Sequence, residues 1–99
     1  MNSPDLDSLD LVRSNIDRLD REIIDLIAQR GAYVIQAARF KASDAEVEAP
    51  QRVEQVIAKV RTLATAAGLD PRVAEAAYRA MIAAFIEVER SAFQAKQAT

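Results

Sequence analysis

The fold is decided by the first third of the chain, where residues 9–41 read LDLVRSNIDRLDREIIDLIAQRGAYVIQAARFK. Apolar residues recur there at alternating steps of three and four, which places their side chains along one face of an α-helix. The pattern continues for over four heptads with one missing member, and it predicts a single helix over about residues 8–41. The seam consists of Leu9, Val12, Ile16, Leu19, Ile23, Leu26, Tyr33, Ala37 and Phe40.

Turn and cap residues after this seam predict two further helices. Pro50 suits the first turn of a helix over residues 50–67, and Gly68 is a natural stop for it. Asp70 and Pro71 form a cap and first-turn pair that begins a third helix, over residues 71–94. Only two glycines and three prolines are present, which is little turn material for a fold of many short strands. We therefore predict one all-α domain over residues 1–99, built from three helices.

The length of the first helix predicts a homodimer. About 34 residues span roughly 50 Å, whereas a compact globule of this size is only about 35 Å across. Twenty alanines and only 26 Val, Ile, Leu or Phe residues make a core thin in large side chains. The apolar end of the helix must be buried against something, and a second chain in an intertwined helical bundle is the simplest answer.

Composition excludes several classes of function. Thirteen basic and 15 acidic residues give a net charge of −2, which disfavours a nucleic-acid binder. The absence of cysteine and histidine removes thiolate chemistry, the commonest metal ligand and the commonest general base. No apolar run approaches a membrane span, and the start of the chain does not resemble a signal peptide. We expect a cytoplasmic protein with no cofactor, no metal and no membrane or nucleic-acid partner.

Two charged residues fall where the helical pattern requires apolar ones. Arg30 is the missing member of the first seam, and Glu89 lies on the stripe of Tyr78, Phe85 and their neighbours in the third helix. Buried charges are costly unless they are paired, so both residues should have partners or a ligand. One alternative is that each residue belongs to a structural ion pair. Another, for Arg30, is that its side chain extends along the seam and places the guanidinium in water at the seam's edge. Together they favour a polar site inside the bundle. Most other charges, among them Arg61 and Arg79, are expected to be solvated.

Two more cations can converge on that site. Lys41 shares a helix face with Arg30 and lies about 16 Å further along the axis. Alternatively, Lys41 is only a cation at the C-terminal end of the helix, where it interacts favourably with the helix dipole. Arg13 is about 25 Å from Arg30, too far to share a small ligand within one chain. If two first helices pair antiparallel about a two-fold axis near Ile24, the partner's Arg13 falls near position 35, between Arg30 and Lys41. Alternatively, Arg13 is a solvated surface residue of the first helix with no role in the site.

Several sequence blocks resemble a known family. They are Val12-Arg13 with Ile16-Asp17 and Leu19-Asp20, then Arg30, Arg39-Phe40-Lys41-Ala42-Ser43, Ala49-Pro50-Gln51-Arg52-Val53 and Phe85-Ile86-Glu87-Val88-Glu89. Over essentially its whole length the chain resembles the all-helical class of chorismate mutases, and most closely their isochorismate pyruvate-lyase branch. The stretch from Arg39 to Val53 is the most specific part of the resemblance.

The resemblance implies an intertwined dimer with two equivalent sites. Arg13 from the partner chain and Arg30 from the host chain would bind substrate carboxylates. Lys41 would lie at the ether oxygen of the enolpyruvyl group, and Glu89 would donate a second hydrogen bond there. Arg52 matches a family arginine near the site. The reactions are pericyclic, so binding the reactive conformer and stabilising charge on the ether oxygen are enough.

Two departures bear on the substrate, which would be chorismate, rearranged to prephenate, or isochorismate, cleaved to pyruvate and salicylate. Typical mutases carry a glutamate that contacts the ring hydroxyl at the position occupied here by Val53, so its loss favours isochorismate or a weak mutase. Glu89 stands where glutamine is frequent, and it must be protonated to donate. A non-catalytic helical dimer that binds a ligand or serves regulation is the alternative function.

Overall fold

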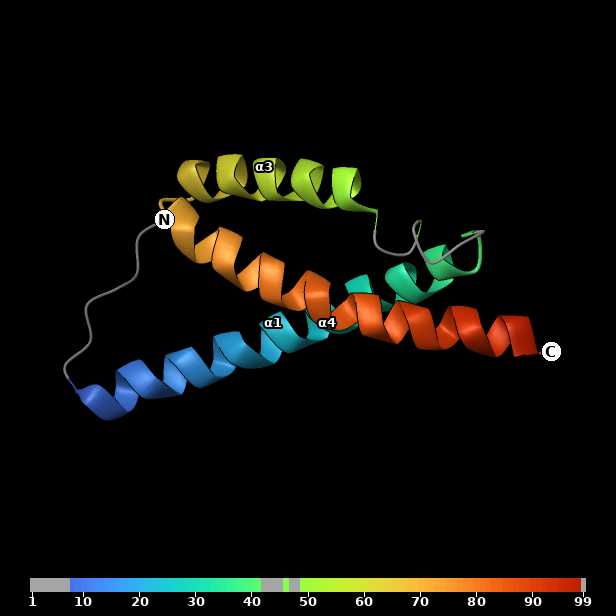
Figure 1. Ribbon diagram of the computed structural model, residues 1–99. Coiled ribbons are helices and arrows are strands. Elements are labelled where there is room, and N and C mark those ends of the chain that lie inside the picture. The colour runs from blue at the N-terminus through green and yellow to red at the C-terminus, as the bar shows by residue number, and fades with distance from the viewer. Residues whose placement is uncertain (1–7, 42–45, 47–48, 99) are drawn as a thin grey trace. The chain divides into compact units, whose positions relative to one another are not determined.

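The computed structural model describes residues 8–41, 46 and 49–98 (Figure 1). Within these residues the fold is all-helical, as predicted, with a long first helix. The helices are α1 (Leu9–Ala38), α3 (Pro50–Ala66) and α4 (Pro71–Ala98). The chain divides into two compact units, one ending at Tyr33 and the other beginning at Val34. Each unit is described here by itself. No helix in the described ranges is long and apolar enough to cross a membrane.

The first unit contains a single described element, the part of α1 that ends at Tyr33. The Ser8 hydroxyl caps its start by accepting a hydrogen bond from the Leu11 amide at 3.2 Å. An ion pair between Arg18 and Glu22, one turn apart and exposed, adds only weak support. A lone helix has no neighbour within its unit to cover an apolar face.

The predicted seam of α1 is exposed in this single chain. Its large apolar side chains up to Tyr33 are 38% to 72% exposed: Leu9, Val12, Ile16, Leu19, Ile23, Leu26 and Tyr33. Monomeric proteins rarely leave a continuous apolar stripe of this length in water. Within its own unit, the predicted seam of α1 is therefore uncovered.

The α1 helix ends earlier than predicted, at Ala38 rather than Lys41. The next three amides bond to carbonyls only three residues back, including Phe40 to Ala37 at 3.0 Å and Lys41 to Ala38 at 3.2 Å. This tightened last turn rotates the backbone away from the helical path. Lys41 consequently lies beyond the helix and does not continue its face.

The second unit is organised by α3 and α4, which pack side by side as a helical hairpin (Figure 1). The Gly68 amide bonds to the Thr65 carbonyl, and the Leu69 amide bonds to the Ala64 carbonyl at 2.8 Å. With Gly68 at φ 77° this is a Schellman motif, which ends α3 at the predicted glycine. The carboxylate of Asp70 then accepts the Arg72 amide at 2.9 Å and caps α4.

Small and branched side chains fill the space between the two helices. Val60, Ala64 and Ala74 are buried together, with Val56 and Tyr78 packed against them. The small alanines allow the helices to approach closely, which is how an alanine-rich chain can still form a core. At its far end α4 continues to Ala98 rather than ending near residue 94, since the added residues are mostly good helix formers.

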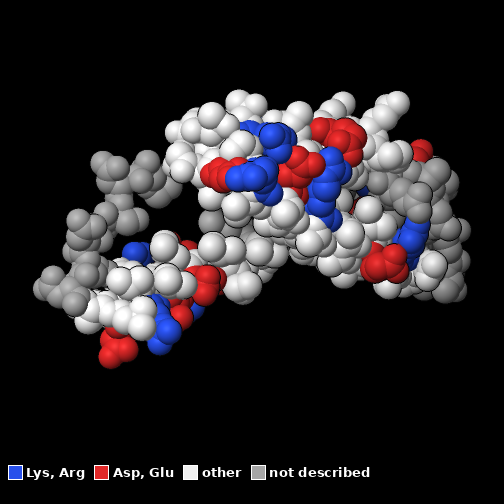
Figure 2. All heavy atoms as spheres, turned by 60° about the vertical axis from the view of Figure 1, so that its left-hand side comes forward, with Lys and Arg blue, Asp and Glu red and all other residues white. Residues whose placement is uncertain are grey.

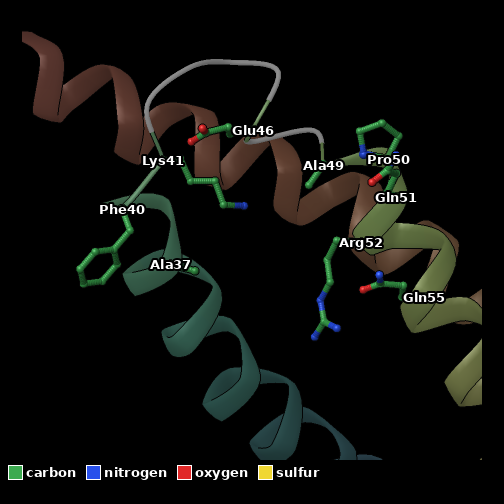
Figure 3. Close-up of a pocket in the computed structure, with 9 residues that line it drawn as sticks. All are labelled: Ala37, Phe40, Lys41, Glu46, Ala49, Pro50, Gln51, Arg52 and Gln55. Atoms are coloured by element: carbon green, nitrogen blue, oxygen red, sulfur yellow. The ribbon is translucent and has the colours of Figure 1, made fainter.

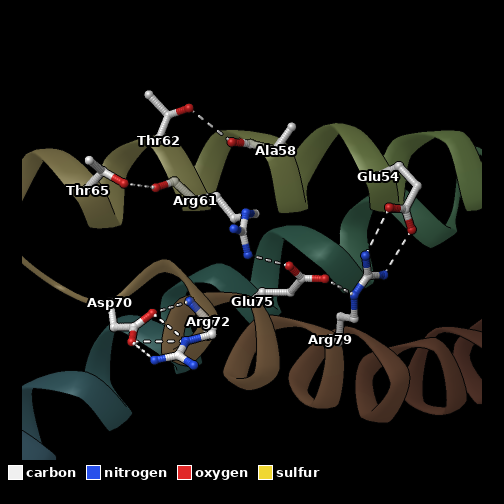
Figure 4. A network of polar contacts seen from close by, with 9 residues as sticks. All are labelled: Glu54, Ala58, Arg61, Thr62, Thr65, Asp70, Arg72, Glu75 and Arg79. Carbon is white, nitrogen blue, oxygen red and sulfur yellow. Dashed lines mark hydrogen bonds and ion pairs between the residues drawn. The ribbon is translucent and has the colours of Figure 1, made fainter.

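A network of ion pairs joins the exposed edges of the hairpin (Figure 4). Arg79 holds both carboxylate oxygens of Glu54 at 2.9 and 3.0 Å and also bonds to Glu75 at 2.8 Å. Arg61 reaches the other oxygen of Glu75 at 2.7 Å. On the face seen in Figure 2, basic and acidic side chains are intermixed rather than gathered by sign. Arg61 and Arg79 thus remain at the surface, but they are paired rather than simply solvated.

Candidate functional site

The second unit contains an open hollow of about 560 Å³ between the end of α1 and the start of α3 (Figure 3). This volume falls within the usual range for small-molecule sites. The hollow is lined by Ala37, Phe40, Lys41, Glu46, Ala49, Pro50, Gln51, Arg52 and Gln55. Two of the predicted site residues, Lys41 and Arg52, therefore line the same hollow.

Lys41 forms an ion pair with Glu89, the third predicted site residue in the second unit. Its ammonium nitrogen lies 2.9 Å from Oε2 of Glu89, and the two side chains are only 22% and 10% exposed. Glu89 is the buried charged residue among those described. The anomalous charge in the third helix therefore has a partner, as a buried carboxylate requires. An ammonium carries three donors, so Lys41 can still bind a second acceptor while it holds Glu89.

Arg52 supplies a second cation from the first turn of α3. Its side chain is exposed, projects from the helix beside the hollow (Figure 3), and forms no ion pair among the described residues. Pro50 opens this helix, and Ala49 before it provides no side-chain cap. The positive end of the helix dipole therefore adds to the two cations. This combination favours a ligand that carries carboxylates.

Arg13 and Arg30 belong to the first unit. Both lie on α1, 17 residues apart by their numbering, which is roughly 25 Å along the helix axis. They therefore cannot bind one small ligand from the same helix. Arg13 forms no ion pair within its own helix. The structure brings together Lys41, Glu89 and Arg52, and it does not bring Arg13 to Arg30.

The side of α3 that faces the hollow carries polar side chains. Gln51 and Gln55 line it together with Arg52, whereas Val53 is half-buried and is not among the described lining residues. Residues at i, i+3 and i+4 share a helix face. Applied to Arg52, this spacing could have identified Gln55 from the sequence. Phe40 and Glu46 also line the hollow and were not predicted to do so as site residues.

In the described part of the chain, no group of three or more Asp, Glu, His or Cys side chains is arranged to hold a metal ion. Every buried side-chain nitrogen and oxygen among these residues has a hydrogen-bond partner. The hollow offers two cations, Lys41 and Arg52, one carboxyl, Glu46, and the amide side chains of Gln51 and Gln55.

Comparison with known proteins agrees with this arrangement. The profile of the type II chorismate mutase family matches residues 12–90, a range that includes all five predicted site residues. The chain therefore belongs to the type II chorismate mutase family and is an enzyme of that family. It is similar to the isochorismate pyruvate lyase of Pseudomonas aeruginosa strain PAO1, with 37% identity over 71 residues, which cover 72% of this chain and 70% of the relative. The family resemblance expected from the sequence is confirmed.

Proposed function

We propose that this protein eliminates pyruvate from isochorismate to leave salicylate, with the rearrangement of chorismate to prephenate as a weaker second activity. The single observation that carries the proposal is the ion pair of Lys41 with buried Glu89 at the wall of a hollow that Arg52 also lines. The similarity to an isochorismate pyruvate lyase supports isochorismate as the preferred substrate.

Both reactions are pericyclic, so the protein needs no nucleophile, metal or cofactor. Its work is to restrict a flexible dianion to the reactive conformer and to stabilise the negative charge that develops on the ether oxygen. A chain without histidine or cysteine can do both. In this mechanism Lys41 donates to the ether oxygen with an ammonium hydrogen that Glu89 does not occupy.

Glu89 contributes a second hydrogen bond to the same oxygen. To donate there, the Glu89 carboxyl must carry its proton, because an ionised carboxylate only accepts hydrogen bonds. Arg52 binds a carboxylate of the substrate, for which the planar guanidinium group is suited.

Arg30 and Arg13 complete the binding of the two carboxylates, Arg30 from the host chain and Arg13 from a partner chain. The shared site requires a homodimer. The exposed seam of α1 supports such pairing, because a second α1 offers a complementary apolar face. A stable folded monomer at micromolar concentration in sedimentation would contradict this assembly.

The experiment offers isochorismate and chorismate separately to the purified protein and follows salicylate, pyruvate and prephenate. The kcat/KM for isochorismate, measured by the formation of pyruvate and salicylate, should be higher than the kcat/KM for chorismate, measured by the formation of prephenate. Lys41→Met should reduce kcat/KM by roughly 10²-fold or more, since one donor at the developing charge is lost. Lys59→Met, at an exposed position of α3 away from the hollow, is the matched control. Ligand-dependent thermal stabilisation without turnover would instead indicate a non-catalytic module.

A further inference from the structure

We propose that Gln55 determines substrate specificity by binding the ring hydroxyl of the substrate. The inference rests on the proposed function, since it assumes a hydroxylated ring dianion in the hollow. Chorismate and isochorismate differ in the position of that hydroxyl. A single hydrogen-bonding group at a fixed place can therefore favour one over the other.

The geometry of α3 places Gln55 beside the carboxylate-binding cation. Arg52 and Gln55 are three residues apart, so they lie on one face of the helix with about 4.5 Å of axial rise between them. Both line the hollow, and Figure 3 shows the two side chains projecting from α3 next to each other. A small ring that places a carboxylate on Arg52 therefore presents its other substituents to Gln55. Gln51 lies at the other side of Arg52, beside Pro50 at the start of the helix.

The chemistry of an amide suits this task. The Gln55 side chain has one acceptor and two donors, so it can bind a hydroxyl in either direction. It is neutral, and it therefore adds no repulsion toward a dianion that Lys41 and Arg52 attract. Among the described residues its amide has no hydrogen-bond partner, so no existing bond must break before it binds a ligand. A site that hydrogen-bonds a substrate hydroxyl discriminates against an analogue without that group in the same place.

Val53 does not provide this contact. It carries no polar group and is half-buried, whereas the described residues of α3 that line the hollow are Pro50, Gln51, Arg52 and Gln55. The hydroxyl contact thus moves from the residue directly after the arginine to the residue one turn further along. Specificity in this chain would depend on a neutral amide instead of a carboxylate.

The test measures kcat/KM for isochorismate and the inhibition constant of chorismate in the wild type and in Gln55→Met. Methionine has a similar length and shape but forms no comparable hydrogen bond. We expect kcat/KM for isochorismate to fall roughly tenfold, the effect of one hydrogen bond, while the chorismate constant stays within about twofold. Gln94→Met, an exposed glutamine of α4 outside the hollow, controls for the chemical change and should leave both values unchanged.

Other outcomes overturn the inference in distinguishable ways. Equal losses for both ligands would mean that Gln55 supports the site without recognising the hydroxyl, and no loss would mean that it does not bind substrate. Wild-type protein that turns over neither compound overturns the proposed function and, with it, the role of Gln55. Circular dichroism checks that each variant is folded, and Gln55→Leu replaces the methionine variant if that one fails.

Discussion

The ammonium of Lys41 lies 2.9 Å from Oε2 of Glu89, although 48 residues separate the two along the chain. The pair joins the turn after α1 to the last third of α4 inside the second unit. Both side chains are largely withdrawn from water. Removing either partner therefore leaves an uncompensated charge, which costs far more than the loss of an exposed pair.

Replacing Glu89 tests whether this residue donates a hydrogen bond to the ether oxygen. Glu89→Gln keeps a donor on a side chain of the same length, so it should retain activity. Glu89→Ala should lose roughly 10²-fold or more. The measurement is kcat/KM for isochorismate in the three proteins.

Two results would contradict this role. If Glu89→Gln is as inactive as Glu89→Ala, the charged carboxylate is needed and hydrogen-bond donation is not its role. If Glu89→Ala is as active as the wild type, the residue serves only as the structural partner of Lys41. Thermal unfolding of each variant separates a loss of stability from a loss of rate.

Mixing inactive variants tests the shared site. Arg13→Ala and Arg30→Ala should each be inactive, because each removes one carboxylate contact from every site. When the two are unfolded together and refolded, a mixed dimer has one site with both lesions and one with neither. Activity should therefore return in the mixture, because each mixed dimer contains one intact site. A verified heterodimer without activity would show that Arg13 does not act across an interface.

The ion pairs of the hairpin predict a pH dependence of stability. Hydrogen bonds from Arg79 hold the pKa of Glu54 below its ordinary value of 4.5, and those from Arg79 and Arg61 do the same for Glu75. A carboxyl whose pKa is lowered in the folded state contributes stability above its unfolded pKa, and the contribution is lost as pH falls through the folded value. The melting temperature should therefore decline below about pH 4.5.

A variant isolates that contribution. Arg79→Met removes the cation shared by Glu54 and Glu75, so its melting temperature should be lower near neutral pH. The difference from the wild type should shrink as the pH falls below 4.5 and the two carboxyls become protonated. The exposed pair of Arg18 and Glu22 offers a control, since Arg18→Met removes an ion pair outside the hairpin. A difference between Arg79→Met and wild type that persists at low pH would show that packing, not charge, is responsible.

The backbone before α3 predicts a stabilising substitution. Ala49 has φ 39° and ψ 60°, in the left-handed region that favours glycine. Ala49→Gly should therefore raise the free energy of unfolding by about 0.5–1 kcal/mol, after the greater entropy of an unfolded glycine is subtracted. Ala58→Gly, at an exposed position inside α3, should lower it by about 1 kcal/mol. Urea unfolding measures both, and a loss of stability in both variants would refute the prediction.

Local signals in the sequence predicted the local structure well. Gly68 and Asp70 act through hydrogen bonds that span only a few residues, and Pro50 acts through its fixed φ and its missing amide hydrogen. Their effects can therefore be derived without the tertiary fold. Glu89 could be identified as a residue in need of a partner because a charge on an apolar stripe is costly wherever the helix packs. The particular partner, Lys41, needed the structure.

The parts that sequence reasoning missed depend on register. Arg79 bridges Glu54 and Glu75 only because the hairpin turn sets which residues of α3 and α4 lie opposite each other. Gln55 rather than Val53 lines the hollow because the rotation of α3 is fixed by packing of Ile57 and Val60 on its buried side. The register cannot be read from helix periodicity alone. The spacing from Arg52 makes Gln55 a candidate but does not fix the rotation of α3.

The Schellman turn between α3 and α4 has a kinetic consequence. Because Gly68 and its neighbours reverse the chain within the few residues between Ala66 and Pro71, the contacts of the hairpin form between segments close in sequence, and such contacts form quickly. The part of α1 before Tyr33 has no such local partner, and an isolated helix in water is only marginally stable. Refolding should therefore show a fast phase that is independent of protein concentration, followed by a slower phase, the ordering of α1 against a second chain, whose rate rises with concentration.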